Sequence, residues 1–184
     1  MNRRDWLIST LSMATWPEIL AAQEHARAAA QSAEPPAFGY LDKPAAADIE
    51  ALASEIIPSG DTPGAREAGV VYFIDRALST FDQGRQGLYR AGLEHADSQR
   101  KALFPASQSI SGLTSAERVE LLRSIERTEF FQLLRDHTIC GFLSDPSYGG
   151  NRGGVGWQVI GFDNQHQHHP PFGYYDAEEK EGSR

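Results

Sequence analysis

The sequence has few of the residues that cross-link a small protein or that bind nucleic acid. Cys140 is its single cysteine, so no disulfide can form within the chain. Acidic residues outnumber basic ones by 25 to 17, and the formal net charge of -8 excludes a general nucleic-acid binder, because such proteins carry basic patches. Neither a Cys-x-x-Cys-His haem motif nor a Gly-x-Gly-x-x-Gly dinucleotide motif occurs, so we predict no cofactor in this chain.

Two adjacent arginines precede a moderately apolar segment at the N-terminus. Arg3 and Arg4 are followed by Trp6 and Leu7, which is the twin-arginine export pattern, and we predict a signal peptide over residues 1–30. Serine, threonine and proline interrupt the apolar run, which is therefore too short and too polar to span a membrane, since a span needs about 20 apolar residues. An amphipathic N-terminal helix is the alternative interpretation.

The twin-arginine route carries folded proteins, often with their cofactors already bound. Because this chain has no cofactor motif of its own, we infer that the signal serves a cofactor-loaded partner that crosses the membrane bound to this chain. We therefore expect the Tat translocase as a partner and the periplasm as the location.

The central part of the chain predicts an all-α fold. Apolar residues recur at helical spacing in five segments, over residues 49–57, 70–81, 85–103, 121–125 and 130–142. Thr114 and Glu117 have the capping-box spacing that begins a helix, and only residues 157–162 have strand character. We predict an irregular helical bundle with long loops, comprising a linker over residues 31–47, a helical domain over residues 48–162 and an extended C-terminal strap over residues 163–184.

The apolar residues of these helical patterns are expected to face inward, and Phe81, Leu103 and Cys140 are among them. Phe81 completes the apolar stripe of the second segment, and Leu103 that of the third. Cys140 lies in the apolar pattern of the last segment and is predicted to be a small buried core residue.

Residues 141–162 combine turn-forming residues with large aromatic side chains. Gly149 and Gly150 allow backbone angles that are closed to other residues, and Asp145-Pro146 ends a helix. Such a segment predicts a shaped surface for a partner rather than a reaction centre. For Asn151 and Arg152, two roles are open: they either anchor the loop or contact a partner. The side chains expected to contact a partner are Tyr148, Asn151, Arg152, Trp157, Phe162, Phe172, Tyr174 and Tyr175.

The polar residues with potential for chemistry favour structural interpretations, and we predict no catalytic residue. The acidic residues around the first long loop, which are Asp61, Glu67 and Asp75, are explained by helix capping or ion pairing with Arg66 and Arg76. His137 is expected to be a hydrogen-bonded core or interface residue, and Asp145 to cap or order a turn. The tail histidines His166, His168 and His169 have metal-ligating side chains, but a surface role is favoured.

Several short motifs together resemble one protein family. They are Gly141 to Asn151 with Gly156-Trp157 and Gly161-Phe162, Ile56-Ile57-Pro58, Thr62 to Ala65, Ala68-Gly69-Val70, Tyr72 to Asp75 and Tyr89 to Leu93. Spanning residues 48–162, they resemble the gluconate 2-dehydrogenase subunit 3 family. The resemblance implies a non-redox small subunit of a periplasmic, membrane-associated dehydrogenase for sugars or sugar acids, of gluconate or glycoside type.

The resemblance also implies the other subunits. The large partner would be an FAD-dependent flavoprotein of the glucose-methanol-choline type, and a cytochrome c subunit carrying haem c would take the electrons onward. This chain would act on the flavoprotein in a chaperone-like way, by stabilising it and carrying it through export. Two alternatives remain. One is a stand-alone periplasmic metal-binding protein that uses the tail histidines, with or without His137. The other is an autonomous enzyme built on Asp145 and His137.

Overall fold

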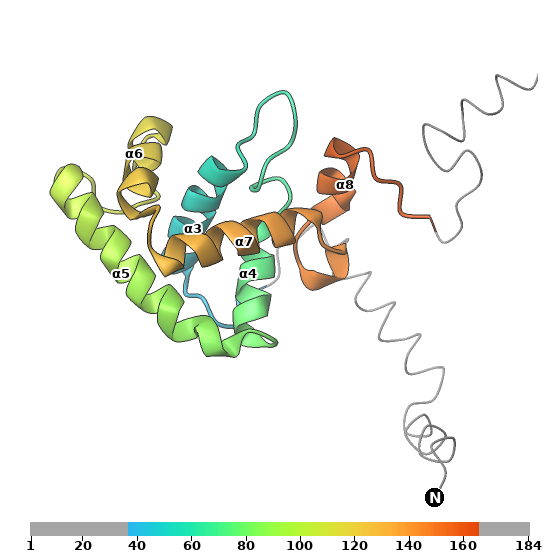
Figure 1. Cartoon of the computed structure of the whole chain (residues 1–184), viewed down its shortest axis with the longest axis horizontal. Coiled ribbons are helices and arrows are strands. Elements are labelled where there is room, and N and C mark those ends of the chain that lie inside the picture. Colours follow the sequence, from blue (N-terminus) through green and yellow to red (C-terminus); the bar gives the residue numbers. More distant parts are fainter. Residues whose placement is uncertain (1–36, 166–184) are drawn as a thin grey trace, which may run out of the picture.

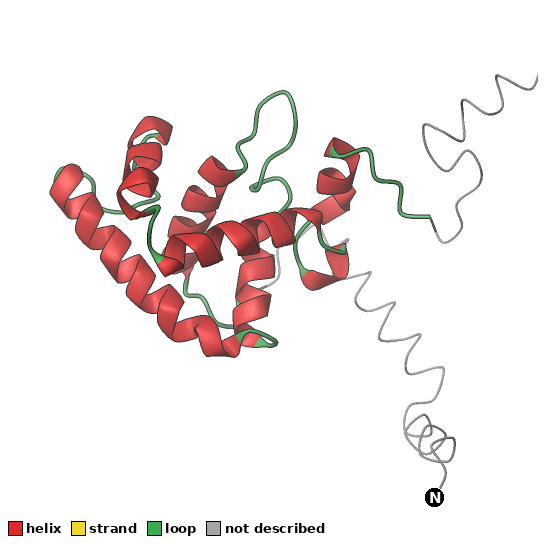
Figure 2. Ribbon diagram, viewed as in Figure 1, coloured by secondary structure: helices red, strands yellow, loops and turns green. Residues whose placement is uncertain are grey.

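A computed structural model of the chain describes residues 37–165. These residues contain six α-helices, which are α3 (Lys43–Ile56), α4 (Val70–Ser79), α5 (Gln86–Leu103), α6 (Ser115–Ile125), α7 (Glu129–Leu143) and α8 (Val155–Val159). Three 3-10 helices join them, η2 (Gln83–Arg85), η3 (Pro146–Tyr148) and η4 (Arg152–Gly154). Within this range there is no strand (Figure 2), which confirms the predicted all-α fold. The expectation of a strand over residues 157–162 is wrong, because the first three of these residues complete α8.

Helix α7 is the central element of the bundle. It lies across α3 and α4 and also packs against α5 and α8 (Figure 1). Helices α5 and α6 lie at one end of the molecule, while α8 and the loop before it lie at the other. The segment predicted to contact a partner is therefore placed where α7 ends.

Side-chain caps define where the helices begin. The Asp42 side chain accepts a hydrogen bond from the backbone of Ala45 at the start of α3. The capping box predicted at Thr114 and Glu117 is present at the start of α6. The Thr128 hydroxyl accepts from the backbone N–H of Phe131, so α7 is a new helix rather than a continuation of α6. Each cap provides an acceptor for an N–H that has no partner within its helix.

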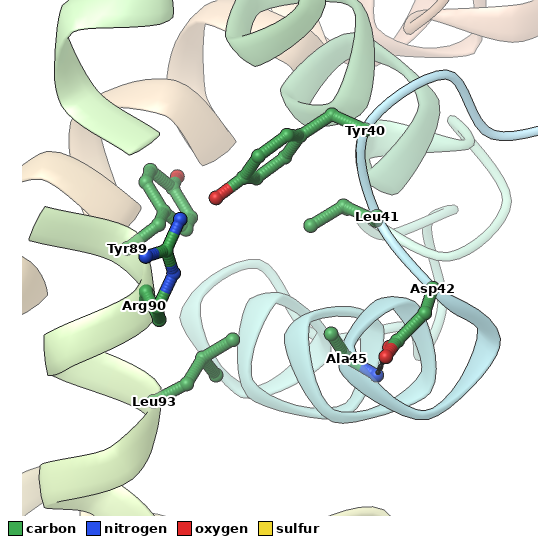
Figure 3. Close-up of a pocket in the computed structure, with 7 residues that line it drawn as sticks. All are labelled: Tyr40, Leu41, Asp42, Ala45, Tyr89, Arg90 and Leu93. Atoms are coloured by element: carbon green, nitrogen blue, oxygen red, sulfur yellow. Dashed lines mark hydrogen bonds between the residues drawn. The ribbon is translucent and has the colours of Figure 1, made fainter. Parts of the chain in front are cut away.

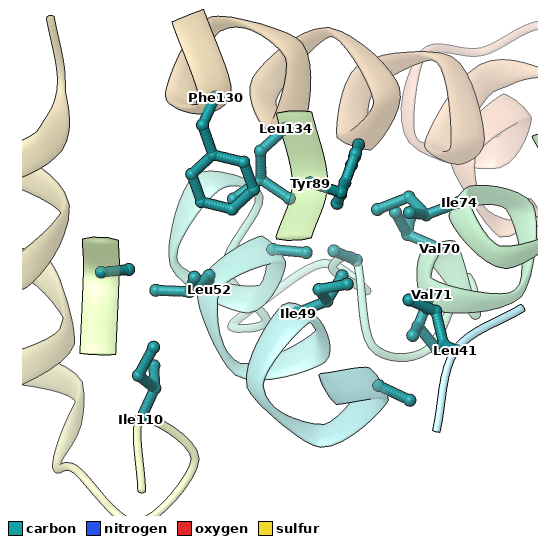
Figure 4. Packing of buried hydrophobic residues seen from close by; sticks show 14 of the residues in the cluster. Leu41, Ile49, Leu52, Val70, Val71, Ile74, Tyr89, Ile110, Phe130 and Leu134 are labelled. Atoms are coloured by element: carbon teal, nitrogen blue, oxygen red, sulfur yellow. The ribbon is translucent and has the colours of Figure 1, made fainter. Parts of the chain in front are cut away.

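The core forms where α3, α4, α5 and α7 meet (Figure 4). Its largest fully buried apolar side chains are Ile49, Leu52, Val70, Ile74, Leu78, Tyr89, Ile110, Leu121, Ile125 and Leu134. These come from every helix except α8, and from the loop before α6. The predicted inward faces of the helices are therefore largely confirmed.

Three residues predicted to face inward are exposed instead. Phe81 is 60% exposed and Leu103 is 40% exposed, because α4 ends two residues before Phe81 and α5 ends at Leu103. Cys140 is also exposed. The buried face of α7 follows helical spacing through Leu134, His137, Thr138 and Gly141, which leaves Cys140 on the opposite side.

The segment before α3 is part of the folded domain. The Asp75 carboxylate on α4 accepts hydrogen bonds from the backbone N–H groups of Gly39, Tyr40 and Leu41 at 2.8, 2.9 and 2.8 Å. Phe38 stacks on the Tyr72 ring with a centroid distance of 5.0 Å. The predicted linker over residues 31–47 is therefore wrong from residue 38 onward. The role expected for Asp75, ion pairing or capping, is replaced by anchoring of this segment.

Glu67 has a local role in the long loop between α3 and α4. Its carboxylate accepts from the Ser59 hydroxyl and from the backbone N–H of Gly64. These two hydrogen bonds, the first having the larger effect, lower the pKa of Glu67, because they favour the charged form. The Glu67 side chain thus links two other positions of the loop, Ser59 and Gly64.

We expect a glycine-to-alanine substitution to have opposite effects on stability at two positions of α5. A Cβ at the buried Gly92 would lie 2.1 Å from Cγ of Phe130, whereas a Cβ at the exposed Gly87 would meet nothing within 4 Å. We expect Gly92→Ala to lower the free energy of unfolding by about 1–2 kcal/mol, because overpacking outweighs the gain in helix propensity. Gly87→Ala should raise it by about 0.5 kcal/mol. Urea denaturation of both variants tests this, and the same sign for both would contradict it.

Candidate partner-binding surface

The loop after α7 folds back closely on that helix. A Cβ at Gly150 would lie 2.1 Å from the carbonyl oxygen of Gly141, and a Cβ at Gly156 would lie 1.9 Å from that of Phe142. Both obstacles are backbone atoms, so only glycine fits at either position. The glycines recognised in the sequence therefore allow the loop to pack against the end of α7.

Asn151 organises this loop from the inside. Its side chain is fully buried, at 0% exposure, and its backbone has the left-handed φ of 45°. Its amide Nδ2 donates to the carbonyl of Ser144 at 2.9 Å, while Oδ1 accepts from the backbone N–H of Gly156 at 2.8 Å. Of its two predicted roles, the structure supports that of loop anchor. We remove Asn151 from the expected partner contacts, because its side chain is not at the surface.

Arg152 and Trp157 are half-buried and bind the loop to the helices. The Arg152 guanidinium lies 3.9 Å from the centroid of the Tyr72 ring, and its backbone N–H donates to the carbonyl of Ala68 at 3.0 Å. The Trp157 indole Nε1 donates to the carbonyl of Leu143 at 2.7 Å. Cation–π and hydrogen-bond contacts of this kind fix both side chains while leaving part of each accessible.

Two of the predicted contact residues are exposed at this end of the molecule. Tyr148 is 49% exposed and Phe162 is 47% exposed. The sequence prediction missed Phe81, whose ring lies 6.3 Å from that of Tyr148 in an edge-to-face arrangement. The polar run Asp82-Gln83-Gly84 directly after Phe81 was the available signal that α4 ends before it. Val159 and Ile160, at the end of α8, are also exposed. Phe172, Tyr174 and Tyr175 lie outside the described residues.

A hydrogen-bonded network of three side chains begins at Asp82, the residue after Phe81. The Tyr89 hydroxyl lies 3.0 Å from Nδ1 of His137, and Nε2 of His137 lies 3.1 Å from a carboxylate oxygen of Asp82. The three residues come from α5, α7 and the turn before η2, respectively. Sequence reasoning foresaw a hydrogen-bonded His137 but not these partners, because they are 48 and 55 residues away along the chain.

Burial determines which of the hydrogen-bonded Tyr89 and His137 side chains carry protons. Burial, with a contribution from the Asp82 charge, raises the pKa of Tyr89 far above its usual range, so its hydroxyl keeps its proton and donates to Nδ1. His137 then carries its proton on Nε2 and donates it to Asp82. Burial lowers the pKa of His137, and the charge and hydrogen bond of Asp82 oppose that effect only in part. Neutral His137 therefore joins three segments of the fold, which is a structural role.

The lowered pKa of His137 makes the stability of the folded state depend on pH. Its folded-state pKa is lower than the usual value, so below about pH 6.5 the unfolded chain binds a proton that the folded chain does not. The folded state is thus progressively destabilised as pH falls. We expect His137→Gln to be less stable than the wild type at about pH 7.5 and the difference to narrow at about pH 5.5. Urea denaturation at both values measures it; a constant difference would contradict the prediction. The same change at the exposed His95 of α5 is the matched control.

Asp145 has the turn-ordering role expected of it and does not pair with His137. Its side chain accepts from the backbone N–H of Ser147 at 2.9 Å, at the start of η3. The hydrogen bonds of both His137 ring nitrogens go to other residues. The geometry therefore does not assemble the Asp145 and His137 pair on which the autonomous-enzyme alternative depends.

A cavity of about 290 Å³ lies between the start of α3 and the first half of α5 (Figure 3). It is lined by Tyr40, Leu41, Asp42, Ala45, Tyr89, Arg90 and Leu93. Most of its polar groups already have partners inside the protein. The Tyr40 hydroxyl donates to the carbonyl of Gln86, the Asp42 carboxylate caps α3, and the Tyr89 hydroxyl bonds His137. The cavity therefore offers few groups to recognise a ligand.

No group of three or more histidine, cysteine, aspartate or glutamate residues within residues 37–165 has a geometry that would hold a metal ion. In the same range, no helix is both long and apolar enough to cross a membrane. The histidines His166, His168 and His169 lie outside this range.

The chain matches one family model. The model is described as Gluconate 2-dehydrogenase subunit 3, and the match covers residues 43–163, which is more than half of the 184 residues. The match begins at the first residue of α3 and includes the described residues of the candidate partner-binding surface, from Phe81 to Phe162. No curated protein and no solved structure matches the chain.

Proposed function

Because the chain belongs to the gluconate 2-dehydrogenase subunit 3 family, we propose that it is the non-redox small subunit of a membrane-associated, FAD-dependent sugar or sugar-acid dehydrogenase. The family name makes it a subunit of a gluconate 2-dehydrogenase complex and so implies partner subunits. In our proposal, the large partner is a flavoprotein of the glucose-methanol-choline type that holds the FAD, and a cytochrome c subunit with haem c takes the electrons onward.

The observation that carries this proposal is the exposure of three aromatic side chains, two of them in the segment that follows α7. Phe81, Tyr148 and Phe162 are each about half exposed or more, and Asn151 and Arg152 hold the loop between them in one conformation. Exposed aromatic side chains on a preformed backbone are what a stable protein interface uses, because little conformational freedom is lost on binding. The chain would stabilise the flavoprotein by covering a complementary apolar surface on it.

Affinity capture of the tagged full-length chain from its native periplasm tests this function. We expect a large partner in roughly equal amount, with the absorbance of a protein-bound flavin and dye-linked oxidation of a sugar or sugar acid in the eluate. A chain that elutes alone and colourless would overturn the proposal. The metal content of that eluate would then test the metal-binding alternative based on the tail histidines.

Export of the flavoprotein by this chain gives a separate prediction. The twin arginines Arg3 and Arg4 would direct the assembled complex to the Tat translocase. We expect the double substitution Arg3→Lys and Arg4→Lys to leave both this chain and the flavoprotein in the cytoplasm. Immunoblots of periplasmic and cytoplasmic fractions measure it, and Arg27→Lys is the matched control outside the arginine pair. A flavoprotein that still reaches the periplasm while this chain does not would show that it is exported independently.

A further inference from the structure

We propose that Phe81 and Tyr148 form the centre of the surface that binds the large subunit, and that Asp82, His137 and Tyr89 hold Phe81 in position for it. This inference rests on the proposed function and names the residues that carry the interaction. Phe81 was not among the contacts predicted from the sequence.

The two side chains make a contiguous aromatic surface. Phe81 is 60% exposed and Tyr148 is 49% exposed, and their rings meet edge to face at 6.3 Å. Phe81 also packs against the buried ring of Phe73 at 6.1 Å, so the exposed pair continues into the core. Aromatic residues of this kind, with one face supported and the other open, are typical of the few positions that dominate binding energy in an interface.

The segment that carries Phe81 is held in place by hydrogen bonds. The backbone N–H of Asp82, the next residue, donates to the carbonyl of Ala77 at 2.8 Å, and its carbonyl accepts from Arg85 at 3.0 Å. The Asp82 carboxylate accepts from His137, which in turn is bonded to Tyr89. The turn is therefore tied to α5 and α7 through buried side chains. Such a link keeps the Phe81 ring on the surface and lowers the entropy cost of binding.

The segment that carries Tyr148 is ordered independently. Its backbone N–H donates to the carbonyl of Asp145 at 2.9 Å, and the Asp145 side chain caps the same 3-10 turn. Each of the two exposed rings is therefore carried by a segment with its own hydrogen bonds.

A second apolar group, formed by Val159, Ile160 and Phe162, is less suited to be the centre. Val159 ends the five-residue helix α8, and Ile160 and Phe162 follow it. The ring of Phe162 packs only against Trp157 among the aromatic contacts of the described residues. Phe81 and Tyr148 instead join two segments that are far apart in the sequence, each fixed by its own hydrogen bonds. The family implies partner subunits, and the occupant we assign to this surface is the large flavoprotein subunit of the proposed function.

Binding of full-length variants to the co-expressed flavoprotein tests the surface. We expect the double variant Phe81→Ala and Tyr148→Ala to bind about 30-fold more weakly than the wild type while remaining folded, with at most a small decrease in the midpoint of urea unfolding, because about half or more of each side chain is exposed. Phe81→Tyr with Tyr148→Phe keeps both rings and should retain binding. Leu103→Ala removes a comparably exposed apolar side chain at the end of α5 and should also bind as the wild type does.

The supporting role of Asp82 is tested by a double-mutant cycle. We expect Asp82→Ala to weaken binding about fivefold when Phe81 is present and to have no further effect in the Phe81→Ala background. An equal effect in both backgrounds would overturn the positioning role. Wild-type affinity in the Phe81→Ala and Tyr148→Ala double variant would overturn the surface and leave the proposed function standing. A wild-type chain that captures no flavoprotein would overturn both.

Discussion

Asp75→Ala is expected to lower the free energy of unfolding by about 3–5 kcal/mol. The Asp75 carboxylate is the common acceptor for three consecutive backbone N–H groups, those of Gly39, Tyr40 and Leu41. Asp75 is 7% exposed, and the loss of its carboxylate leaves one buried donor, that of Leu41, and two partly buried ones without their acceptor. Hydrogen bonds to a charged group are stronger than neutral ones, and an unsatisfied buried donor carries its full desolvation cost.

Asp75→Asn provides a graded comparison. One oxygen of Asp75 accepts from both Tyr40 and Leu41, and the other accepts from Gly39. An asparagine can keep the first oxygen but presents an NH₂ group to Gly39, so we expect about half of the loss seen with alanine. Asp61→Ala, at an exposed loop position, is the control and should change stability by less than about 0.5 kcal/mol. Urea denaturation measures all three variants, and similar stabilities for Asp75→Ala and Asp61→Ala would refute the anchoring role.

The second large effect is expected at Asn151. Asn151→Ala should lower the free energy of unfolding by about 3–4 kcal/mol, because it leaves the N–H of Gly156 and the carbonyl of Ser144 without their partners. Part of this loss is backbone strain, since the φ of 45° suits asparagine better than alanine, by about 1 kcal/mol. The loop would lose its link between the end of α7 and the start of α8, whereas the turn that carries Tyr148 keeps its own hydrogen bonds.

Asn151→Gly separates the two contributions. Glycine adopts a positive φ without strain, so the loss that remains in this variant, about 2–3 kcal/mol, measures the two hydrogen bonds. Gln158→Ala, which removes an exposed side chain from α8, is the control and should stay close to the wild type. Equal stability of Asn151→Gly and the wild type would mean that the side chain does not organise the loop.

The helical part of the fold was predictable from the sequence because helix formation depends largely on local patterns. Apolar spacing located the segments that became α3 to α7, and the capping box at Thr114 and Glu117 located the start of α6. The errors occurred where a helix ends. Phe81 and Leu103 fit the apolar stripes of their helices but lie at or beyond the last turn, where the stripe no longer faces the core.

The candidate surface was only partly predictable. Its glycines and aromatics stand out in the sequence, but nothing local distinguishes the buried Asn151 from the exposed Tyr148. Nothing local in the sequence indicates that Asp82, a residue type usually found at the surface, is hydrogen-bonded to His137 in the fold. Burial and side-chain pairing depend on contacts between residues that are dozens of positions apart, and periodicity carries no information about them.

By itself, the sequence determined the all-α class, the positions of the helices and the family, since these follow from local spacing, capping residues and short motifs. Only the tertiary structure decided that Asp75 anchors the segment before α3, that Asn151 is internal, and that Phe81 lies beside Tyr148. The physical reason is the range of the interactions. Helix propensity and capping act within about four residues, whereas each of these pairings forms only when distant segments pack together and exclude water from the groups between them.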